Sequence, residues 1–294
     1  MEYVNCNNCG QDTTNLLFTK RGFNIVRCSS CGLVYTNPRV PFQNTKDIYN
    51  QSYFKSGDSL SAGYDNYIAE RPTIEVTFKK RLDFIMRNAP SLGVTGGRRV
   101  LDIGCAAGFL LDILRKNGWE CEGVELSEYA VDYANKELKI DVRQGVLGDF
   151  EYPENHFDLV VCWDVIEHCY DPKRDLKIMY NIVKSGGYLS LITPDMGSLH
   201  AKIARHRWVE FEKPEEHLYF FSKEILKRIL REIGFELVAS TTAGKYVTVN
   251  FALNRLKSYS GIFGLIQRAV NERSGNRYIF VNPFDKMFIL ARKV

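Results

Sequence analysis

The chain has 294 residues, of which 45% are hydrophobic and 25% charged, and its formal net charge is +4. These values are typical of a globular protein with one large domain, or one domain with appendages. The sequence pI of about 8.5 is below the ~9 that marks dedicated nucleic-acid-binding domains, so the charge argues against a nucleic-acid partner. No apolar run approaches the ~18 residues of a membrane span. The polar first residues lack a signal-peptide core, and we expect a cytoplasmic protein.

The first 40 residues contain two matched cysteine pairs in the pattern C-x2-C-x18-C-x2-C. The four cysteines are Cys6, Cys9, Cys28 and Cys31. This spacing is typical of four-cysteine zinc sites, and the glycines that follow each pair, Gly10 and Gly32, suit tight turns. Four thiolates complete the tetrahedral shell, so the ion would be a structural Zn²⁺ with no catalytic position. We therefore predict a small zinc-ribbon module over residues 1–40.

Residues 41–95 are predicted to be a linker followed by N-terminal helices. Two prolines lie within 36–44, which favours a connecting segment. Residues 45–90 have a mainly helical pattern with polar interruptions.

From residue 99 onward, apolar runs typical of strands alternate with segments of helical spacing. Strands are expected at 99–103, 119–126, 157–168 and 188–194, with a short third strand within 141–150. Helices are expected at 108–117, 127–138 and 172–183. We expect Ser127 to cap the second helix and the Gly186–Gly187 turn to end the third. A helix at 223–235 and strands at 236–242 and 287–293 complete the pattern.

This alternation predicts an α/β fold over residues 96–294, Rossmann-like and doubly wound, with a mostly parallel seven-stranded sheet. The apolar segment 251–270 is broken by glycines and is expected to be part of a helical insertion near 251–275. Such an insertion either covers a substrate cavity or forms the surface of a homodimer.

The stretch "VLDIGCAAGF" (100–109) predicts a strand, a glycine turn and the start of a helix. A dinucleotide-binding G-x-G-x-x-G would need glycine at 104, 106 and 109, where this chain has Gly104, Ala106 and Phe109. A P-loop would need Lys-Ser or Lys-Thr after Gly108, and neither is present. The turn suits close approach of a ligand without phosphates, although a purely structural turn remains the alternative.

Polar residues follow several of the predicted strands, at the edge where open parallel sheets bind ligands. Glu125 ends the second strand, where a carboxylate can accept both hydroxyl hydrogens of a ribose. Asp149 could accept from the amine of adenine, with Phe150 packed on its ring. Trp163 and Asp164 end the fourth strand. A ligand with ribose and adenine but no phosphate is S-adenosylmethionine.

Residues 99–193 resemble the class I S-adenosylmethionine-dependent methyltransferases, in the branch related to ubiquinone-biosynthesis O-methyltransferases. The resemblance rests on "VLDIGCAAG", "GVEL", "GDF", "FDLVVCWDVIEH" and "VKSGGYLSLITP", and on "EHLYFFS" at 216–222. The chain departs from the family at Ala106, where glycine is usual. We expect this alanine to be tolerated if its φ is negative. The cysteine module resembles that of bacterial methyltransferases of sugar and surface-polysaccharide pathways and, more loosely, of zinc-bearing ribosomal RNA methyltransferases.

The resemblance implies a set of cofactor-binding residues. Asp102, Gly104, Ala106 and Gly108 would surround the methionine moiety, Glu125 the ribose, Leu126, Asp149 and Phe150 the adenine, and Trp163 and Asp164 the other side of the cofactor. For Trp163, a place in the core is the alternative.

Methyl transfer to a hydroxyl needs a group that accepts its proton, and histidine titrates near neutral pH. His168, at the end of the fourth strand, is the first candidate base and His217 the second. Either could instead only orient a loop. Glu167 and His168 could share a metal ion, but two ligands do not define a site.

We therefore expect a methyltransferase that acts on oxygen of a small molecule or of a sugar or glycan precursor. An RNA methyltransferase is one alternative, against which stand the modest charge and "WDVI" in place of an Asn-Pro-Pro-Tyr motif. A second alternative is a C-methyltransferase of a nucleotide-linked sugar. A third is an inactive zinc-ribbon adaptor, but Glu125 and the intact glycine turn argue against it.

Overall fold

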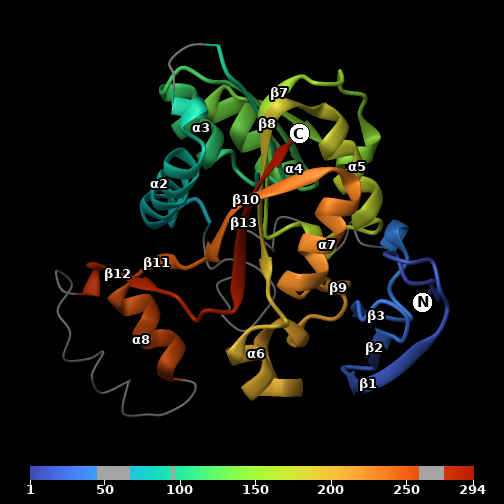
Figure 1. Ribbon diagram of the computed structural model, residues 1–294. Coiled ribbons are helices and arrows are strands. Elements are labelled where there is room, and N and C mark those ends of the chain that lie inside the picture. Colours follow the sequence, from blue (N-terminus) through green and yellow to red (C-terminus); the bar gives the residue numbers. More distant parts are fainter. Residues whose placement is uncertain (45–66, 94–96, 258–274) are drawn as a thin grey trace.

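The computed structural model describes residues 1–44, 67–93, 97–257 and 275–294 (Figure 1). Its centre is a seven-stranded sheet in the order β10-β13-β8-β7-β4-β5-β6. The strands are β4 (Arg99–Ile103), β5 (Glu120–Glu125), β6 (Asp141–Gln144), β7 (Phe157–Trp163), β8 (Val183–Pro194), β10 (Phe235–Thr242) and β13 (Lys286–Lys293). Five are parallel, and β13 is antiparallel to both of its neighbours. The predicted seven-stranded, mostly parallel sheet is confirmed.

The strand order reverses at β4. The chain passes from β4 to β5 and β6 on one side and then returns to β7 on the other side. The carboxyl ends of β4, β5 and β7 therefore meet at a topological switch point, the place where open α/β sheets bind ligands.

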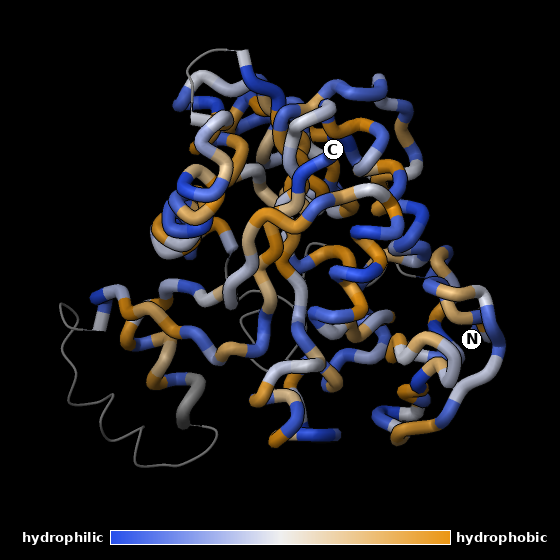
Figure 2. Tube along the Cα trace, in the orientation of Figure 1, coloured by the Kyte–Doolittle hydropathy of each residue, from blue (hydrophilic) through white to orange (hydrophobic). Residues whose placement is uncertain are grey.

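Helices cover both faces of this sheet (Figure 1). One layer contains α2 (Arg71–Asn88), α3 (Phe109–Lys116) and α4 (Glu128–Tyr133), and the other contains α5 (Pro172–Ile182) and α7 (Lys223–Ile233). Since successive strand residues point to opposite faces, Val100 packs in the α2–α3 layer and Leu101 in the α5–α7 layer. Figure 2 shows the hydrophobic residues gathered along the strands and the inner helix faces.

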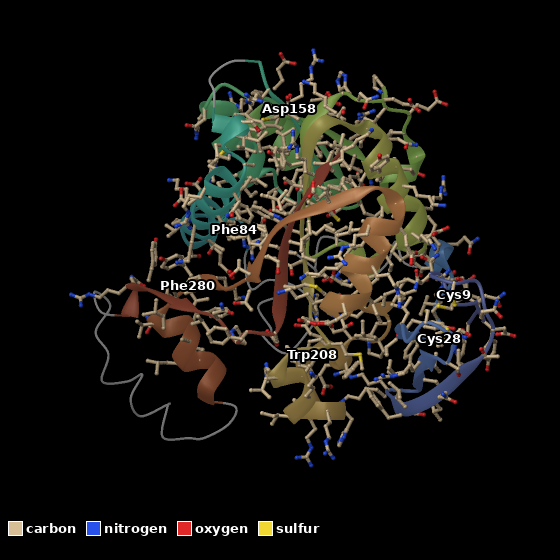
Figure 3. The ribbon with its side chains drawn as sticks, in the orientation of Figure 1. Cys9, Cys28, Phe84, Asp158, Trp208 and Phe280 are labelled. Atoms are coloured by element: carbon tan, nitrogen blue, oxygen red, sulfur yellow. The ribbon has the colours of Figure 1, made fainter. Side chains whose placement is uncertain are left out.

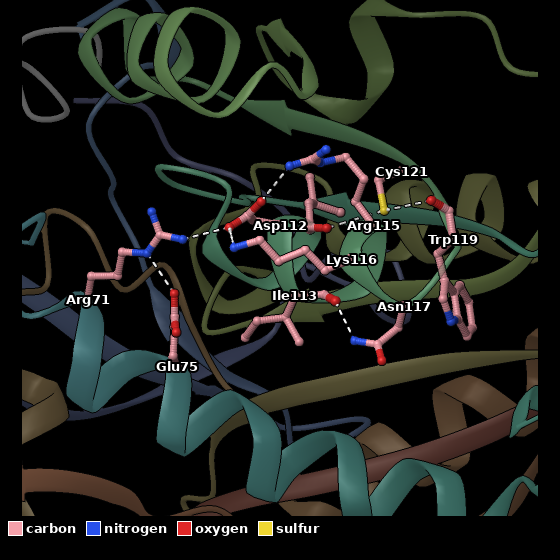
Figure 4. A network of polar contacts seen from close by, with 10 residues as sticks. Arg71, Glu75, Asp112, Ile113, Arg115, Lys116, Asn117, Trp119 and Cys121 are labelled. Carbon is pink, nitrogen blue, oxygen red and sulfur yellow. Dashed lines mark hydrogen bonds and ion pairs between the residues drawn. The ribbon is translucent and has the colours of Figure 1, made fainter.

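An ion network on Asp112 joins α2 to α3 (Figure 4). This side chain is only 3% exposed, and its oxygens accept from Arg71 at 2.6 Å, Arg115 at 2.8 Å and Lys116 at 2.7 Å. Burial opposes ionisation, but the hydrogen bonds from Lys116 and Arg115 outweigh it and lower the pKa of Asp112. The network fixes the helix that begins at the glycine turn.

We expect Asp112→Ala to lower the free energy of unfolding by about 2 kcal/mol, because three charge-assisted hydrogen bonds to a buried carboxylate are lost. Asp132→Ala is the matched control, since the Asp132–Lys136 pair on α4 is exposed and its loss should cost less than ~0.5 kcal/mol. Urea unfolding of both variants measures the difference. Equal effects would contradict the structural role of the network.

The N-terminal segment forms strands β1 (Thr14–Lys20), β2 (Phe23–Cys28) and β3 (Val34–Thr36). Its antiparallel sheet has a fourth member, β9 (Tyr219–Phe220), which pairs with β3. The Arg39 guanidinium adds hydrogen bonds to the Tyr170 carbonyl at 2.8 Å and the Tyr219 hydroxyl at 3.1 Å. The first 40 residues thus share a sheet with a distant part of the chain. The domain limits predicted at residues 40 and 95 stay predictions.

Several predicted boundaries were wrong for identifiable reasons. The strand expected over 157–168 ends at Trp163, because Asp164 has a φ of +57° that interrupts the extended backbone. The helix expected over 127–138 is α-helical only to Tyr133 and continues as a π-helix. Gly186–Gly187 is not the end of a helix but part of β8, and a Cβ at Gly187 would lie 3.1 Å from the Asp158 carbonyl of β7.

Two strands of the C-terminal part were not indicated by the sequence pattern, whereas the helix beside them overlaps the start of the predicted helical insertion. Strands β11 (Lys245–Thr248) and β12 (Tyr278–Val281) form an antiparallel pair beside α8 (Val249–Lys257). Residues 258–274 of the predicted insertion lie outside the described residues, and its role as cavity cover or dimer surface stays a prediction.

A short helix, α6 (Leu199–Ala204), follows β8. Short 3-10 turns lie at 42–44, 90–93, 147–149, 166–168, 205–207 and 209–212. Among the described residues, no helix has the length and apolar character that crossing a bilayer requires.

Candidate functional site

The glycine turn after β4 closes tightly against β5. The backbone N–H of Gly104 donates to the Val124 carbonyl at 2.7 Å. Gly104 and Gly108 have φ values of +70° and +77°, and a Cβ at Gly104 would collide with Val165. Both positions therefore require glycine.

Ala106 does not have the negative φ that was expected for an alanine at this position. Its φ is +47°, a left-handed conformation that costs an L-residue roughly 1–2 kcal/mol. The turn holds it there through a hydrogen bond from the Ala106 N–H to Glu125 Oε2 at 3.0 Å. The backbone at this turn is therefore strained rather than relaxed.

Glu125 links the end of β5 to the glycine turn. Besides Ala106, its carboxylate accepts from the Ser127 N–H, through Oε1 at 2.8 Å. Burial raises the pKa of Glu125, and these backbone hydrogen bonds act in the opposite direction. Each oxygen accepts one backbone hydrogen and keeps a lone pair, which suits two neighbouring hydroxyl groups.

Asp102, near the carboxyl end of β4, is also buried. Burial raises the pKa of Asp102 well above its usual value, and the nearby Glu125 adds to this rise. Within the described residues, its carboxylate has no hydrogen-bond or ion-pair partner. A buried acidic group in this situation fits a cationic ligand group, such as the amino group of S-adenosylmethionine.

The residues predicted around adenine follow the next two strands. Leu126 lies between Glu125 and Ser127, and its carbonyl accepts from Gln144 at 3.4 Å. Asp149 is exposed and accepts from the Val146 N–H at 2.9 Å. Phe150 has the Arg143 guanidinium 4.8 Å from its ring centre. The adenine contacts of Leu126, Asp149 and Phe150 stay predictions.

Trp163 and Asp164 have different surroundings despite being neighbours in sequence. The Trp163 indole is buried, donates to Ser190 at 2.9 Å, and has its ring centre 5.5 Å from that of Phe78. This placement favours the core alternative for Trp163. Asp164 instead forms an ion pair with Lys286, whose Nζ lies 2.6 Å from its Oδ1.

His168 and His217 are brought together beside this ion pair. Their ring centres lie 4.7 Å apart in an edge-to-face arrangement. His168 Nδ1 lies 3.0 Å from the Glu216 carbonyl, and His217 Nδ1 lies 2.9 Å from the Glu210 carbonyl. We call this group the two-histidine cluster. Its members are Asp164, Glu167, His168, Glu210, His217 and Lys286.

Sequence reasoning missed Lys286 and Glu210 in this cluster, as well as Thr193, whose hydroxyl donates to Glu167 at 2.9 Å. Lys286 begins the last strand and reaches Asp164 across the fold. A lysine at the start of a strand carries no local signal for such a contact, so only the three-dimensional arrangement reveals it.

Burial sets the protonation of the cluster. It lowers the pKa of His168 to about 4 and that of His217 well below its usual value. It also raises the pKa of Glu167 to about 8, with the Asp164 charge adding to the effect. Both imidazoles are therefore neutral at pH 7, and Glu167 is mostly protonated.

We expect the contribution of His168 to the free energy of unfolding to fall as the pH is lowered from 6.5 to 4. In this window the unfolded chain protonates His168 while the folded chain does not, so proton uptake favours unfolding by about 2–3 kcal/mol. Glu167 opposes this slope, because the stability that its raised pKa contributes is lost as the pH rises through about 8. Urea unfolding of wild type and His168→Asn at several pH values isolates the histidine contribution. An identical acid-side slope in both proteins would contradict the expectation.

The four N-terminal cysteines form one cluster, and two of them, Cys9 and Cys28, are labelled in Figure 3. Their sulfur atoms all lie within 4.8 Å of one another, with Cys6 and Cys31 3.4 Å apart and Cys9 and Cys28 3.5 Å apart. A tetrahedral ion with zinc–sulfur bonds of ~2.3 Å would place its sulfur ligands about 3.8 Å apart. Thiolate donors at this spacing fit Zn²⁺.

The two turns that carry these cysteines have the same form. The N–H of Gly10 donates to the Cys6 carbonyl at 2.8 Å, and that of Gly32 to the Cys28 carbonyl at 3.0 Å. Both glycines have a positive φ, +76° and +81°, as the knuckle prediction requires. Burial opposes ionisation of Cys28, but backbone N–H groups of Cys31 and Ser30 lower its pKa to about 7.

A methyltransferase-domain family matches residues 74–240 of this chain. Among curated proteins, the ubiquinone biosynthesis O-methyltransferase of Alkalilimnicola ehrlichii is 28% identical over 156 residues, which cover 46% of this chain and 62% of that protein. The protein of the same name from Aromatoleum aromaticum is 34% identical over 119 residues, or 38% of this chain and 49% of that one. The chain thus spans about half to three-fifths of these relatives.

Solved structures agree on the fold. The structure of a protein from Bacillus halodurans C-125 described as a methyltransferase superposes with a TM-score of 0.53 at 19% identity, covering 72% of this chain and 98% of that one. A geranyl diphosphate methyltransferase in complex with GPP and sinefungin gives a TM-score of 0.51 at 15% identity, covering 74% and 78%.

Proposed function

This chain belongs to the methyltransferase-domain family, which matches more than half of its length; we propose that it is an S-adenosylmethionine-dependent methyltransferase that methylates oxygen. The acceptor in this proposal is a small molecule or a sugar or glycan precursor. The names of the relatives in ubiquinone biosynthesis support oxygen as the acceptor atom. The observation that carries the proposal is the pair of neutral imidazoles at the switch-point edge of the sheet.

In this proposal the glycine turn and the two buried carboxylates hold the cofactor. Glu125 would accept hydrogen bonds from the ribose hydroxyls, and Asp102 would hold the amino group of the methionine moiety. When bound, S-adenosylmethionine supplies a methyl group on a sulfonium that is open to in-line displacement. The chain contributes orientation of the acceptor and exclusion of water.

His168 is the residue that we propose to take the proton from the acceptor hydroxyl. The Glu216 carbonyl can only accept, so His168 Nδ1 carries the hydrogen and the lone pair lies on Nε2. This lone pair would accept the hydroxyl proton while the new bond between oxygen and methyl carbon forms. A base with a pKa near 4 is weak, which favours an acceptor whose hydroxyl is acidic, such as a phenol.

The proposed zinc ion has a different role. Four thiolates leave it no open position, so it would stabilise the N-terminal strands and take no part in methyl transfer. Those strands pair with β9, which follows His217 within two residues. The ion would therefore support the position of His217 indirectly.

A panel of phenolic, sugar and nucleotide-sugar acceptors tests the function. We expect S-adenosylhomocysteine to form in step with a product whose new methyl group is on oxygen, as located by NMR. His168→Asn should lower kcat about tenfold, less than most general bases because the imidazole is weakly basic, and should leave the dissociation constant for S-adenosylmethionine unchanged. A methyl group on carbon or nitrogen would contradict the proposal, as would full activity of His168→Asn.

A further inference from the structure

A groove of about 640 Å³ lies between the N-terminal strands and α6, away from the residues assigned to cofactor and acceptor. One wall comes from β1 and β2, and the other from α6 and the turns at 205–212. Its apolar lining includes Leu17, Phe18, Val34, Met196, Phe211 and Phe220. The volume is in the range that holds several side chains of a partner.

The rim of this groove is basic. Arg27 stands on the β2 wall, and Lys202, Arg205 and His206 stand on the α6 wall, against one carboxylate, Glu224. In the part of the chain that the structure describes, Arg27, Lys202 and Arg205 form no ion pair. This contrasts with the nearby Lys20 and Arg21, which both pair with Glu212. The rim therefore presents cations whose charge the chain itself does not neutralise.

Three apolar side chains on the elements that form the walls are also exposed to solvent. Leu199 and Ile203, one turn apart on α6, are each 73% exposed, and Leu16 on β1 is 60% exposed. None of the three lines the groove itself.

The backbone of Arg205 is strained at this rim. Its φ and ψ are +51° and −129°, a conformation that normally requires glycine. The turn that follows is anchored by Trp208, which is fully buried and donates to Asp285 at 3.0 Å (Figure 3). The backbone of Arg205 is therefore held in one conformation next to an anchored turn.

We propose that this groove binds an acidic amphipathic helix of a partner protein. Apolar side chains of the helix would enter the groove, and its carboxylates would pair with Arg27 on one wall and Lys202 and Arg205 on the other. The groove is concave. A row of side chains from a helix can fill it, whereas a flat bilayer surface cannot. Phe18 and Phe211 pack edge to face with ring centres 4.9 Å apart, so they do not form the open stacking platform that single-stranded RNA uses.

The bound helix would contact the turn that positions the second candidate base. Phe211 lines the groove, and the preceding residue, Glu210, accepts the hydrogen bond of His217. This proposal goes beyond the oxygen-methylation proposal, because binding can be measured without any methyl transfer.

Fluorescence anisotropy of the full chain with a labelled synthetic helix tests the proposal. The probe has about 15 residues, with Leu and Phe on one face and Glu on the other. A helix with Lys in place of Glu, an oligouridine and phosphatidylglycerol-containing vesicles are the comparison probes. We expect saturable binding of the acidic helix and no comparable binding of the other three. Failure of the acidic helix to bind, or equal binding of any comparison probe, overturns the proposal.

Charge reversals on both walls locate the site. Arg27→Glu and Lys202→Glu should each weaken binding about tenfold, whereas Lys177→Glu, an exposed lysine of α5, should not. The Arg205→Gly variant should bind the helix more weakly, because the charge is removed. Its unfolding temperature should stay at or above that of the wild type, because glycine relieves the backbone strain. Binding that is insensitive to both walls would overturn the proposal. So would a loss of binding in Arg205→Gly that accompanies unfolding.

Discussion

Replacing Glu125 with alanine is expected to weaken S-adenosylmethionine binding about a hundredfold, since two hydrogen bonds from ribose hydroxyls to a charged group are lost, worth roughly 3 kcal/mol together. The same substitution leaves the N–H groups of Ala106 and Ser127 without their acceptor, which loosens the strained glycine turn. Calorimetric titration of the folded variant with S-adenosylmethionine measures the change.

Two further variants make this result specific. Glu120→Ala changes an exposed glutamate of the same strand, paired with Arg99, and should bind the cofactor as the wild type does. Glu125→Gln keeps the size of the side chain and should give an intermediate affinity. A Glu125→Ala protein that binds with wild-type affinity would remove Glu125 from the cofactor site.

Replacing Cys9 with serine is expected to release the metal and unfold the N-terminal strands. Structural zinc contributes on the order of 10 kcal/mol to folding in small zinc-binding units, and β1 to β3 have little core of their own. Elemental analysis should find one zinc per chain in the wild type and much less in the variant. Limited proteolysis should then cut within the first 40 residues.

Cys121→Ser is the matched control for this prediction. Cys121 lies on β5 with its thiol directed at the backbone carbonyls of Leu111 and Trp119, far from the four-cysteine cluster in the fold. Its replacement should leave the zinc content and the protease resistance of the N-terminal segment unchanged. A Cys9→Ser protein that keeps its zinc and its resistance would refute the structural role.

The sheet was predictable from the sequence because both of its faces are buried. The strand β7 is almost entirely apolar and β4 has an apolar centre, and glycines or caps separate the strands from amphipathic helices. The rules for parallel crossovers then restrict the order and direction of the five parallel strands, whereas the antiparallel β13 lies outside these rules. The ends of strands and helices were less predictable. Apolar residues continue after Trp163 in the sequence, but the positive φ of Asp164 ends the strand there.

The site was predictable where its residues follow strands directly, and less so where it depends on contacts between distant segments. Glu125 and the glycine turn lie within one strand–turn–helix unit, and the structure joins them through Ala106. The ion pair of Asp164 with Lys286 and the approach of His217 to His168 depend instead on the last strand and on the segment after α6. Nothing in the local pattern around Lys286 marks it as a partner of Asp164.

The pairing of β3 with β9 has a consequence for how the protein responds to heat. A zinc module on a flexible tether would melt by itself and give a separate calorimetric peak. Here Tyr35 and Tyr219 face each other across the strands, and the residues of both segments belong to the same apolar core as α5 and α7. Loss of the proposed zinc ion would therefore weaken the fold as a whole, and zinc supply would become a condition for its thermal tolerance. Calorimetry should accordingly show one cooperative transition whose midpoint shifts when the ion is chelated.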